Sequence, residues 1–268
     1  MTITINAITP DFVAEIYDAD LTRLIPDADF TAIANAFWKY SVLIFPEQDL
    51  TQQQQLAFAE RFGPIERERT LDPKATPSRF DGAFSDISNL THEGKIWGAD
   101  SRQRMYKAGN KLWHTDSSFK YLPSLTSLLH ARTTVPIGGH TEFADQRAAY
   151  DALPADMKKK IDGLVAEHCI AYSRRRNGFA EFTEEEQRRL PPVPQMLVRI
   201  YEAVAAPGGL GAVPAGRPVL VDEVDAEVRG QRGPIGDECG PVLLGQEVDD
   251  GAPGEDLVEQ RRHLLPPP

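Results

Sequence analysis

Residues 112–119 have the sequence LWHTDSSF, which is the most informative short motif in the chain. In an extended segment, positions two apart project to the same side, so the imidazole of His114 and the carboxylate of Asp116 can converge on one ion. An imidazole and a carboxylate are two of the three protein ligands in the facial triad that holds non-haem Fe(II). Because H-x-D also arises frequently by chance, its meaning depends on the surrounding sequence.

The segments around this motif carry a more specific signal. SVLIFPEQDLT (41–51) and AFAERFGPIE (57–66) precede it, and SLLHARTTVPIGGHTEFADQRAAYDAL (127–153) and VAEHCIAYSR (165–174) follow it. Together these segments resemble the family of taurine dioxygenase and 2,4-dichlorophenoxyacetate dioxygenase, whose members depend on Fe(II) and 2-oxoglutarate. The resemblance extends from about residue 5 to about residue 199 and is closer to the aryloxyalkanoate branch than to the taurine branch.

The resemblance implies a fold, a cofactor and a set of site residues. The fold would be mainly β with flanking helices, a double-stranded β-helix or jelly roll that is incomplete at the C-terminus. His114 and Asp116 would be ligands of Fe(II), and Thr141 would hydrogen-bond a carboxylate of the cosubstrate 2-oxoglutarate. Lys95 is the candidate for binding the substrate carboxylate, and the Arg174–Arg176 cluster is a weaker one because a run of charges is more often a solvated face.

The third metal ligand is the point at which this sequence departs from the family pattern. The family supplies a second histidine far along the chain in a WDNR-type segment, followed by an arginine that pairs with 2-oxoglutarate. His263 stands at the expected separation from His114 and is the candidate third ligand, but it lies in EQRRHLLPPP and no corresponding arginine follows it. A solvated histidine is the competing interpretation, because the groups that would orient a ligand are missing.

The implied reaction is hydroxylation of an aryloxyalkanoate such as 2,4-dichlorophenoxyacetate at the carbon beside the ether oxygen. The products would be a phenol, glyoxylate, succinate and CO2, which places the chain in the degradation of aromatic herbicides. Two alternatives stay open: a dioxygenase of the taurine or sulfonate type, and a catalytically silent truncated homologue. Without the oxoacid arginine, we expect the chain as written to turn over poorly.

The overall composition restricts the partners and the compartment. With 41% hydrophobic and 26% charged residues and no apolar run near the ~18 residues of a membrane span, the chain is expected to be globular and cytoplasmic. A net charge of −11 argues against a nucleic acid or an anionic membrane. The expected partners are a small-molecule carboxylate and O2, with a homo-oligomer left open. Cys169 and Cys239 are expected to be free thiols.

The composition changes near residue 200 and divides the chain into a dioxygenase domain (1–199) and a tail (200–268). The tail holds 11 of the 20 glycines, 13 acidic against five basic side chains, and one aromatic residue, Tyr201. Such a segment buries too little apolar surface to offset its ordering entropy, so we expect it to be disordered. It is either a genuine acidic tail or a GC-rich reading frame translated out of register. The biased composition favours the second explanation, which resequencing of the DNA around codons 195–205 would test.

Local patterns predict the helices and strands of the first 199 residues. Phe30, Ile33, Ala34, Phe37 and Trp38 recur at helical spacing, and Thr51 with Gln54 forms a capping box that begins a helix with Leu56, Ala59 and Phe62 on one face. Residues 65–110 are expected to form a long, irregular connection. His130 and His168 are expected to be core or pocket residues with satisfied ring nitrogens rather than metal ligands. The predicted helices are 29–40, 51–62, 145–153 and 155–164, and the predicted strands are 41–45, 125–131, 140–144 and 166–172.

Overall fold

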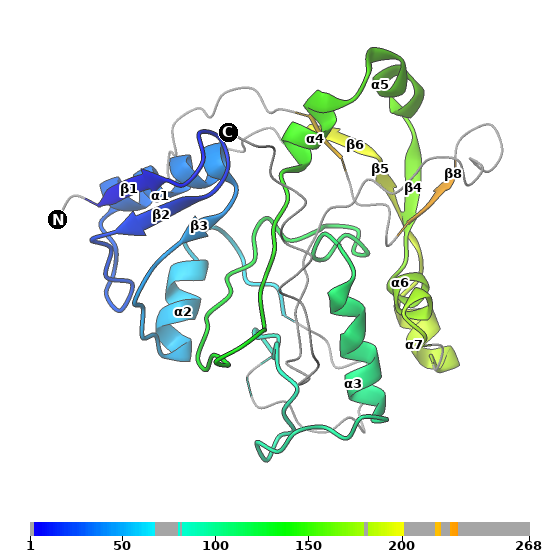
Figure 1. Cartoon of the computed structure of the whole chain (residues 1–268), viewed down its shortest axis with the longest axis horizontal. Coiled ribbons are helices and arrows are strands. Elements are labelled where there is room, and N and C mark those ends of the chain that lie inside the picture. The colour runs from blue at the N-terminus through cyan, green and yellow to red at the C-terminus, as the bar shows by residue number, and fades with distance from the viewer. Residues whose placement is uncertain are drawn as a thin grey trace.

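The computed structural model describes residues 3–67, 80, 82–179, 182–200, 218–220 and 226–229. These residues form two three-stranded sheets, one two-stranded sheet and several short helices. Figure 1 shows the elements of residues 3–62 on one side of the molecule and helices α4–α7 with strands β4–β8 on the other. None of the helices in this described part of the chain is long and apolar enough to cross a membrane.

The N-terminal unit is a small mixed sheet covered by a helix. Strand β1 (Thr4–Ala7) pairs antiparallel with β2 (Ala14–Tyr17), and β2 pairs in parallel with β3 (Leu43–Ile44). Ala14 and Ile16 alternate along β2 and both point into the core. The strand predicted over 41–45 is confirmed in position, although only its centre, Leu43–Ile44, is a strand and Ile44 is 41% exposed.

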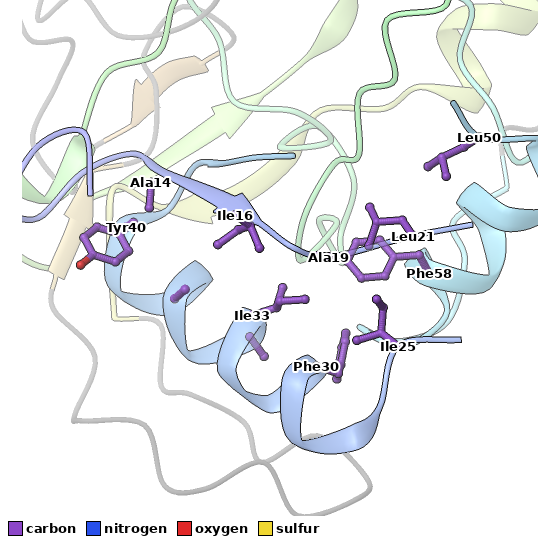
Figure 2. Packing of buried hydrophobic residues seen from close by; sticks show 12 residues of the cluster. Ala14, Ile16, Ala19, Leu21, Ile25, Phe30, Ile33, Tyr40, Leu50 and Phe58 are labelled. Carbon is purple, nitrogen blue, oxygen red and sulfur yellow. The ribbon is translucent and has the colours of Figure 1, made fainter. Parts of the chain in front are cut away.

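Helix α1 (Asp27–Tyr40) confirms the helix predicted from apolar spacing. Its buried face includes Phe30, Ile33 and Ala34, which belong to the same apolar cluster as Ile16 of β2; Figure 2 shows Ile33 facing Ile16 and Phe30 beside Ile25. Asp27 and Asp29 lie in its first turn and Lys39 in its last, where charges of these signs interact favourably with the helix dipole.

Helix α2 (Gln52–Ala59) begins with the predicted capping box, in which Thr51 and Gln54 each bond the other's backbone N–H. The buried face differs from the prediction, because Gln55 and Phe58 are buried whereas Leu56, Ala59 and Phe62 are only partly so. Phe58 lies among the aromatic rings of this unit, with edge-on contacts to Phe30, Phe45 and Phe62 at centroid distances of 6.3, 5.6 and 5.6 Å.

The middle of the chain is less regular than the sequence suggests at some places and more regular at others. A helix, α3 (Arg102–Lys107), and a 3-10 turn, η1 (Ala108–Lys111), lie within the predicted irregular connection. The strands predicted over 125–131 and 140–144 are wrong for this structure, in which both segments are irregular. Residues 125–131 nevertheless keep a two-residue alternation, with Thr126, Leu128 and His130 half-buried and their neighbours exposed.

The C-terminal unit begins with two helices that the sequence predicted, α4 (Gln146–Ala152) and α5 (Ala155–Ile161). Strand β4 (Val165–His168) follows, but the chain then enters helix α6 (Ile170–Arg176), so the strand predicted over 166–172 is correct only in its first half. Helix α7 (Glu184–Arg189) and strands β5 (Val193–Met196) and β6 (Val198–Ile200) complete this part. Ala166, Leu197, Ile161 and Leu164 form its small apolar cluster.

Two short strands belong to the segment beyond residue 200. Strand β7 (Pro218–Leu220) pairs with β6, and β8 (Ala226–Arg229) pairs with β4 to give the sheet order β5-β4-β8. At these two places the structure differs from the disorder expected of the tail. The rest of that segment, including Cys239, lies outside the described residues.

Arg147 of α4 joins the two sides of the molecule. Its guanidinium donates hydrogen bonds to the backbone carbonyls of Trp38 and Lys39 at 3.1 Å and of Asp11 at 3.0 Å. Asp145, which caps α4, forms an ion pair with the same side chain at 3.1 Å. Both side chains of the pair are nearly buried, so the contact holds α4 firmly against the end of α1.

Candidate functional site

His114 and Asp116 lie side by side, as their spacing predicts. The Nε2 atom of His114 is 3.2 Å from Oδ1 of Asp116. The backbone from Trp113 to Thr115 is irregular, and a turn begins at Asp116. The imidazole is largely covered while the carboxylate is about half exposed, with side-chain exposures of 14% and 54%. The pair therefore has a protein-facing side and a side open to small molecules.

A hydrogen bond at Nδ1 of His114 leaves Nε2 as the ring nitrogen that can bind a metal. Nδ1 of His114 lies 2.7 Å from the carbonyl oxygen of Leu112, so Nδ1–H donates there and Nε2 is directed toward Asp116. Metal-binding histidines usually donate their second N–H in this way. Adjacent ligands of an octahedral ion, each about 2.1 Å from it, would be about 3 Å apart. The separation of Nε2 and Oδ1 fits one ion bound by both side chains.

The Asp116 carboxylate has partners on both oxygens. Ser127 donates a hydrogen bond to Oδ2 at 2.8 Å, and Oδ1 faces His114. When Nε2 of His114 also carries a proton, its hydrogen bond lowers the pKa of Asp116 from its ordinary value; desolvation opposes this, and the Ser127 bond lowers it further. A bound ion would take the place of that proton between the two side chains. Asp116 is therefore held as the anion that a metal ligand must be.

A network around Glu66 supports the turn that follows Asp116. Ser117 has a left-handed backbone, with φ of 58°, which is uncommon for a residue with a side chain. Its hydroxyl contacts the Glu66 carboxylate at 3.2 Å, and Lys120 and Ser124 contact the same carboxylate. Burial alone would raise the pKa of Glu66, but its hydrogen bonds, first of all from Lys120, lower it. The strained turn is thus held by a charged group 51 positions earlier in the chain.

A side chain of strand β5 also holds this turn. The side-chain amide of Gln195 donates to the carbonyl oxygens of Ser118 at 3.0 Å and Lys120 at 2.8 Å. Gln195 is 8% exposed and Ser118 is 1% exposed, so these bonds are shielded from water. The turn after Asp116 therefore has a fixed position relative to the β5-β4-β8 sheet.

Helix α3 leads into the motif and is itself fixed to α6 and α7. Arg102 reaches both oxygens of Glu186 at 2.8 and 2.7 Å, and the ring of Tyr106 meets Phe179 edge-on at 5.5 Å. Arg174 lies over Tyr106 and donates to Asn110 at 2.8 Å. Of the arginine cluster, Arg174 is thus engaged in packing, whereas Arg175 and Arg176 are exposed.

The structure places the remaining candidate residues as follows. Thr141 is half-buried in the irregular segment after Gly138 and Gly139, which both have left-handed backbones. Lys95 is exposed and forms an ion pair with Glu93 at 2.9 Å. His263 lies outside the described residues. In the described part of the chain, no group of three or more His, Cys, Asp or Glu side chains is arranged to hold a metal ion.

Three residues near the site were missed by sequence reasoning: Glu66, Ser127 and Gln195. Each acts through a contact between segments far apart in the chain, and none lies in a recognisable motif. Glu66 and Ser127 do fall within two of the four quoted family segments, 57–66 and 127–153, which is the signal that could have drawn attention to them.

His168 contradicts the expectation of a histidine with satisfied nitrogens, and His130 meets it at one nitrogen only. His130 is half-buried; its Nε2 lies 3.0 Å from the carbonyl oxygen of Gln48, whereas its Nδ1 is buried without a hydrogen-bond partner. His168 on β4 is fully buried, and neither ring nitrogen has a hydrogen-bond partner. Desolvation, with a smaller contribution from the charge of Arg199, lowers the pKa of His168 to about 4. The ring is therefore neutral at physiological pH.

We expect this histidine to destabilise the fold in mild acid. Between about pH 6.5 and pH 4 the unfolded chain binds the proton and the folded chain does not, so stability is complete above that range and falls as the pH is lowered. At about 1.4 kcal/mol per pH unit, the loss amounts to roughly 3 kcal/mol. The check is urea unfolding of wild type and His168→Gln from pH 7.5 to pH 4. The stability difference between them should change by this amount, while His92→Gln, an exposed control, should follow wild type. A difference independent of pH would contradict the assignment.

Comparison with known proteins gives a consistent family match. The model of the family described as taurine catabolism dioxygenase TauD, TfdA matches residues 4–238. This match extends past residue 199, where the resemblance recognised in the sequence was expected to end. It therefore includes strands β7 and β8.

The chain is also similar to two individual 2-oxoglutarate-dependent dioxygenases and to one solved structure. The chain is 40% identical over 202 residues to the alpha-ketoglutarate-dependent 2,4-dichlorophenoxyacetate dioxygenase of Cupriavidus pinatubonensis, covering 75% of this chain and 70% of that protein. It is 35% identical over 156 residues to the (S)-phenoxypropionate/alpha-ketoglutarate-dioxygenase of Sphingobium herbicidovorans, covering 58% of this chain and 49% of that protein. The crystal structure of AAD-2 in complex with Mn(II) and N-oxalylglycine matches with a TM-score of 0.76 and 38% identity, over 87% of this chain and 77% of that one.

Proposed function

The chain belongs to the taurine catabolism dioxygenase TauD, TfdA family, and on that premise we propose that it hydroxylates an aryloxyalkanoate such as 2,4-dichlorophenoxyacetate. It is an Fe(II)- and 2-oxoglutarate-dependent dioxygenase by family. The products would be a phenol, glyoxylate, succinate and CO2. The observation that carries the proposal is the His114–Asp116 pair, whose ligand atoms are 3.2 Å apart in a chain that is 40% identical to a 2,4-dichlorophenoxyacetate dioxygenase.

The proposed roles of the residues follow from their positions. His114 Nε2 and Asp116 Oδ1 would hold the iron, which when bound activates O2 with 2-oxoglutarate as the reductant. Leu112 and Ser127 keep these two side chains oriented through their hydrogen bonds. The hydroxyl of Thr141 would donate a hydrogen bond to a carboxylate of 2-oxoglutarate. The cosubstrate 2-oxoglutarate, at Thr141, and the aryloxyalkanoate, at Lys95, would then be bound by different segments of the chain.

Lys95 is the proposed contact for the substrate carboxylate. Its ammonium group is exposed and is paired with Glu93, which is also exposed. An exposed ion pair of this kind contributes little free energy, so a substrate carboxylate can replace Glu93 at small cost. Lys95 is thus available to recognise an acid, which all aryloxyalkanoates share.

The jelly roll and the two-part division of the chain are proposed on different grounds. The TM-score of 0.76 to the AAD-2 complex, over 87% of this chain, supports the jelly roll. The division into 1–199 and 200–268 rests on the change of composition near residue 200. His263 remains the proposed third ligand, at the separation from His114 that the family uses. The role of His263 can be tested by Mn(II) titration of His263→Ala, as for the alanine variants of His114 and Asp116.

The direct test is substrate-dependent release of succinate from 2-oxoglutarate under O2 with added Fe(II). Because no arginine follows His263 to pair with 2-oxoglutarate, we expect turnover to be slow. Within that slow turnover, 2,4-dichlorophenoxyacetate should stimulate succinate release several-fold over the rate without substrate and yield the phenol in equal amount, while taurine has no effect. Stimulation by taurine alone would instead assign the chain to the sulfonate-type reaction. No stimulation by either acid, in protein whose mass matches this sequence, would identify a catalytically silent homologue.

A further inference from the structure

We propose that Ser127 is a positioning residue that makes Asp116 a single-oxygen metal ligand. The inference rests on the proposed function, because it concerns how the proposed ligand is held. Two observations support it: the two oxygens of the Asp116 carboxylate have different partners, and the segment that contains Ser127 is hydrogen-bonded to the N-terminal unit.

The two oxygens of Asp116 have different partners. Oδ1 faces His114 Nε2 at 3.2 Å, which is the side on which the ion would lie, and Oδ2 accepts the Ser127 hydroxyl at 2.8 Å. A free carboxylate on an exposed side chain can exchange its oxygens by rotation, or offer both to one ion. A hydroxyl bound to Oδ2 opposes both movements, because each would leave that bond unmade. The open positions needed by a bidentate oxoacid and by O2 are then preserved.

Ser127 can do this because its backbone is fixed from outside the site. The next residue, Leu128, accepts a hydrogen bond from the Gln55 side chain at 3.2 Å, and His130 Nε2 lies 3.0 Å from the Gln48 carbonyl. Both anchors belong to the N-terminal unit. The alternation of residues 125–131 places Ser127 on the exposed side of the segment, where its hydroxyl reaches the half-exposed Asp116.

The neighbouring hydroxyls provide an internal comparison. Ser117 and Ser124 bond the Glu66 carboxylate rather than Asp116, so they support the turn and not the ligand. Thr126 is next to Ser127 in sequence but is on the opposite, half-buried side of the segment. Thr126→Val removes a hydroxyl one position from Ser127 without removing a contact to Asp116, and it is the matched control.

The experiment measures Mn(II) affinity in the full chain without turnover, from the electron paramagnetic resonance signal of free Mn(II). We expect Ser127→Ala to weaken Mn(II) binding by about 10- to 100-fold, the range found for groups that orient a metal ligand. Ser127→Thr keeps the hydroxyl and should restore affinity to within about threefold of wild type, and Thr126→Val should match wild type. The midpoint of urea unfolding should be the same for all of these variants, which separates positioning from folding.

The outcomes separate this inference from the proposed function. If Asp116→Ala weakens Mn(II) binding and Ser127→Ala does not, the role of Ser127 is wrong and the metal site stands. If Ser127→Thr loses as much affinity as Ser127→Ala, the hydroxyl is not the active group and the inference also fails. If wild type binds no Mn(II), or Asp116→Ala binds it as tightly as wild type does, both the proposed metal site and the inference are overturned.

Discussion

His114→Ala should abolish 2-oxoglutarate-dependent turnover and weaken Mn(II) binding by more than about 100-fold. Removing a group that merely orients a ligand already costs 10- to 100-fold in affinity, so removing the ligand itself should cost more. Two observations single out this ring: its Nδ1 bond to the Leu112 carbonyl and its Nε2 distance of 3.2 Å from Asp116. The measurements are Mn(II) titration and succinate release, made on the same protein preparation.

The control is His92→Ala, which removes an exposed imidazole from the same chain. It should leave Mn(II) affinity at the wild-type value. Urea unfolding must also show that His114→Ala is folded, so that a lost metal site is distinguished from a lost structure. Wild-type Mn(II) affinity in folded His114→Ala would refute the assignment of this histidine.

Phe58→Ala should destabilise the fold by about 3–5 kcal/mol, which is the usual cost of removing a buried phenylalanine ring. Phe58 is 7% exposed and has edge-on contacts with Phe30, Phe45 and Phe62, so its loss leaves a cavity bordered by three rings. Native domains are stable by only 5–15 kcal/mol, so this single change removes a large part of the total. The measurement is the free energy of unfolding in urea.

Leu24→Ala is the matched comparison for this variant, because Leu24 is 84% exposed. It should change the free energy of unfolding by no more than about 0.5 kcal/mol. A similar small change for Phe58→Ala would mean that the aromatic cluster contributes little to stability. The packing shown in Figure 2 would then not be the core of the N-terminal unit.

Local signals predicted the helices better than the strands. Helices α1 and α2 were predictable because apolar spacing and the Thr51–Gln54 capping box act between residues a few positions apart. A strand also needs a neighbour that completes its hydrogen bonds, and the sequence of 125–131 contains no information about that neighbour. The segment keeps its alternating burial but has no ladder in the described residues, so Leu125 and Leu129 remain about half exposed.

The same distinction applies to the site. The approach of His114 and Asp116 follows from a two-residue spacing, which can be recognised in a sequence. The Ser127 bond spans 11 positions, the Glu66 bond to Ser117 spans 51, and the Gln195 bond to Ser118 spans 77. These contacts depend on how separate segments pack, and no local pattern in the sequence reveals that packing.

The contact of Arg147 with the N-terminal unit has a consequence for how this protein can diverge. All three of its long-range acceptors are main-chain carbonyls, at Asp11, Trp38 and Lys39. Substitution of those three side chains therefore leaves the acceptors in place, so the contact with Arg147 does not restrict which residues occupy these positions. The donor Arg147 is restricted, because a lysine has one ammonium group and cannot reach all three carbonyl oxygens at once. Among distant homologues that dock these two regions alike, position 147 should stay arginine while its neighbours across the boundary vary.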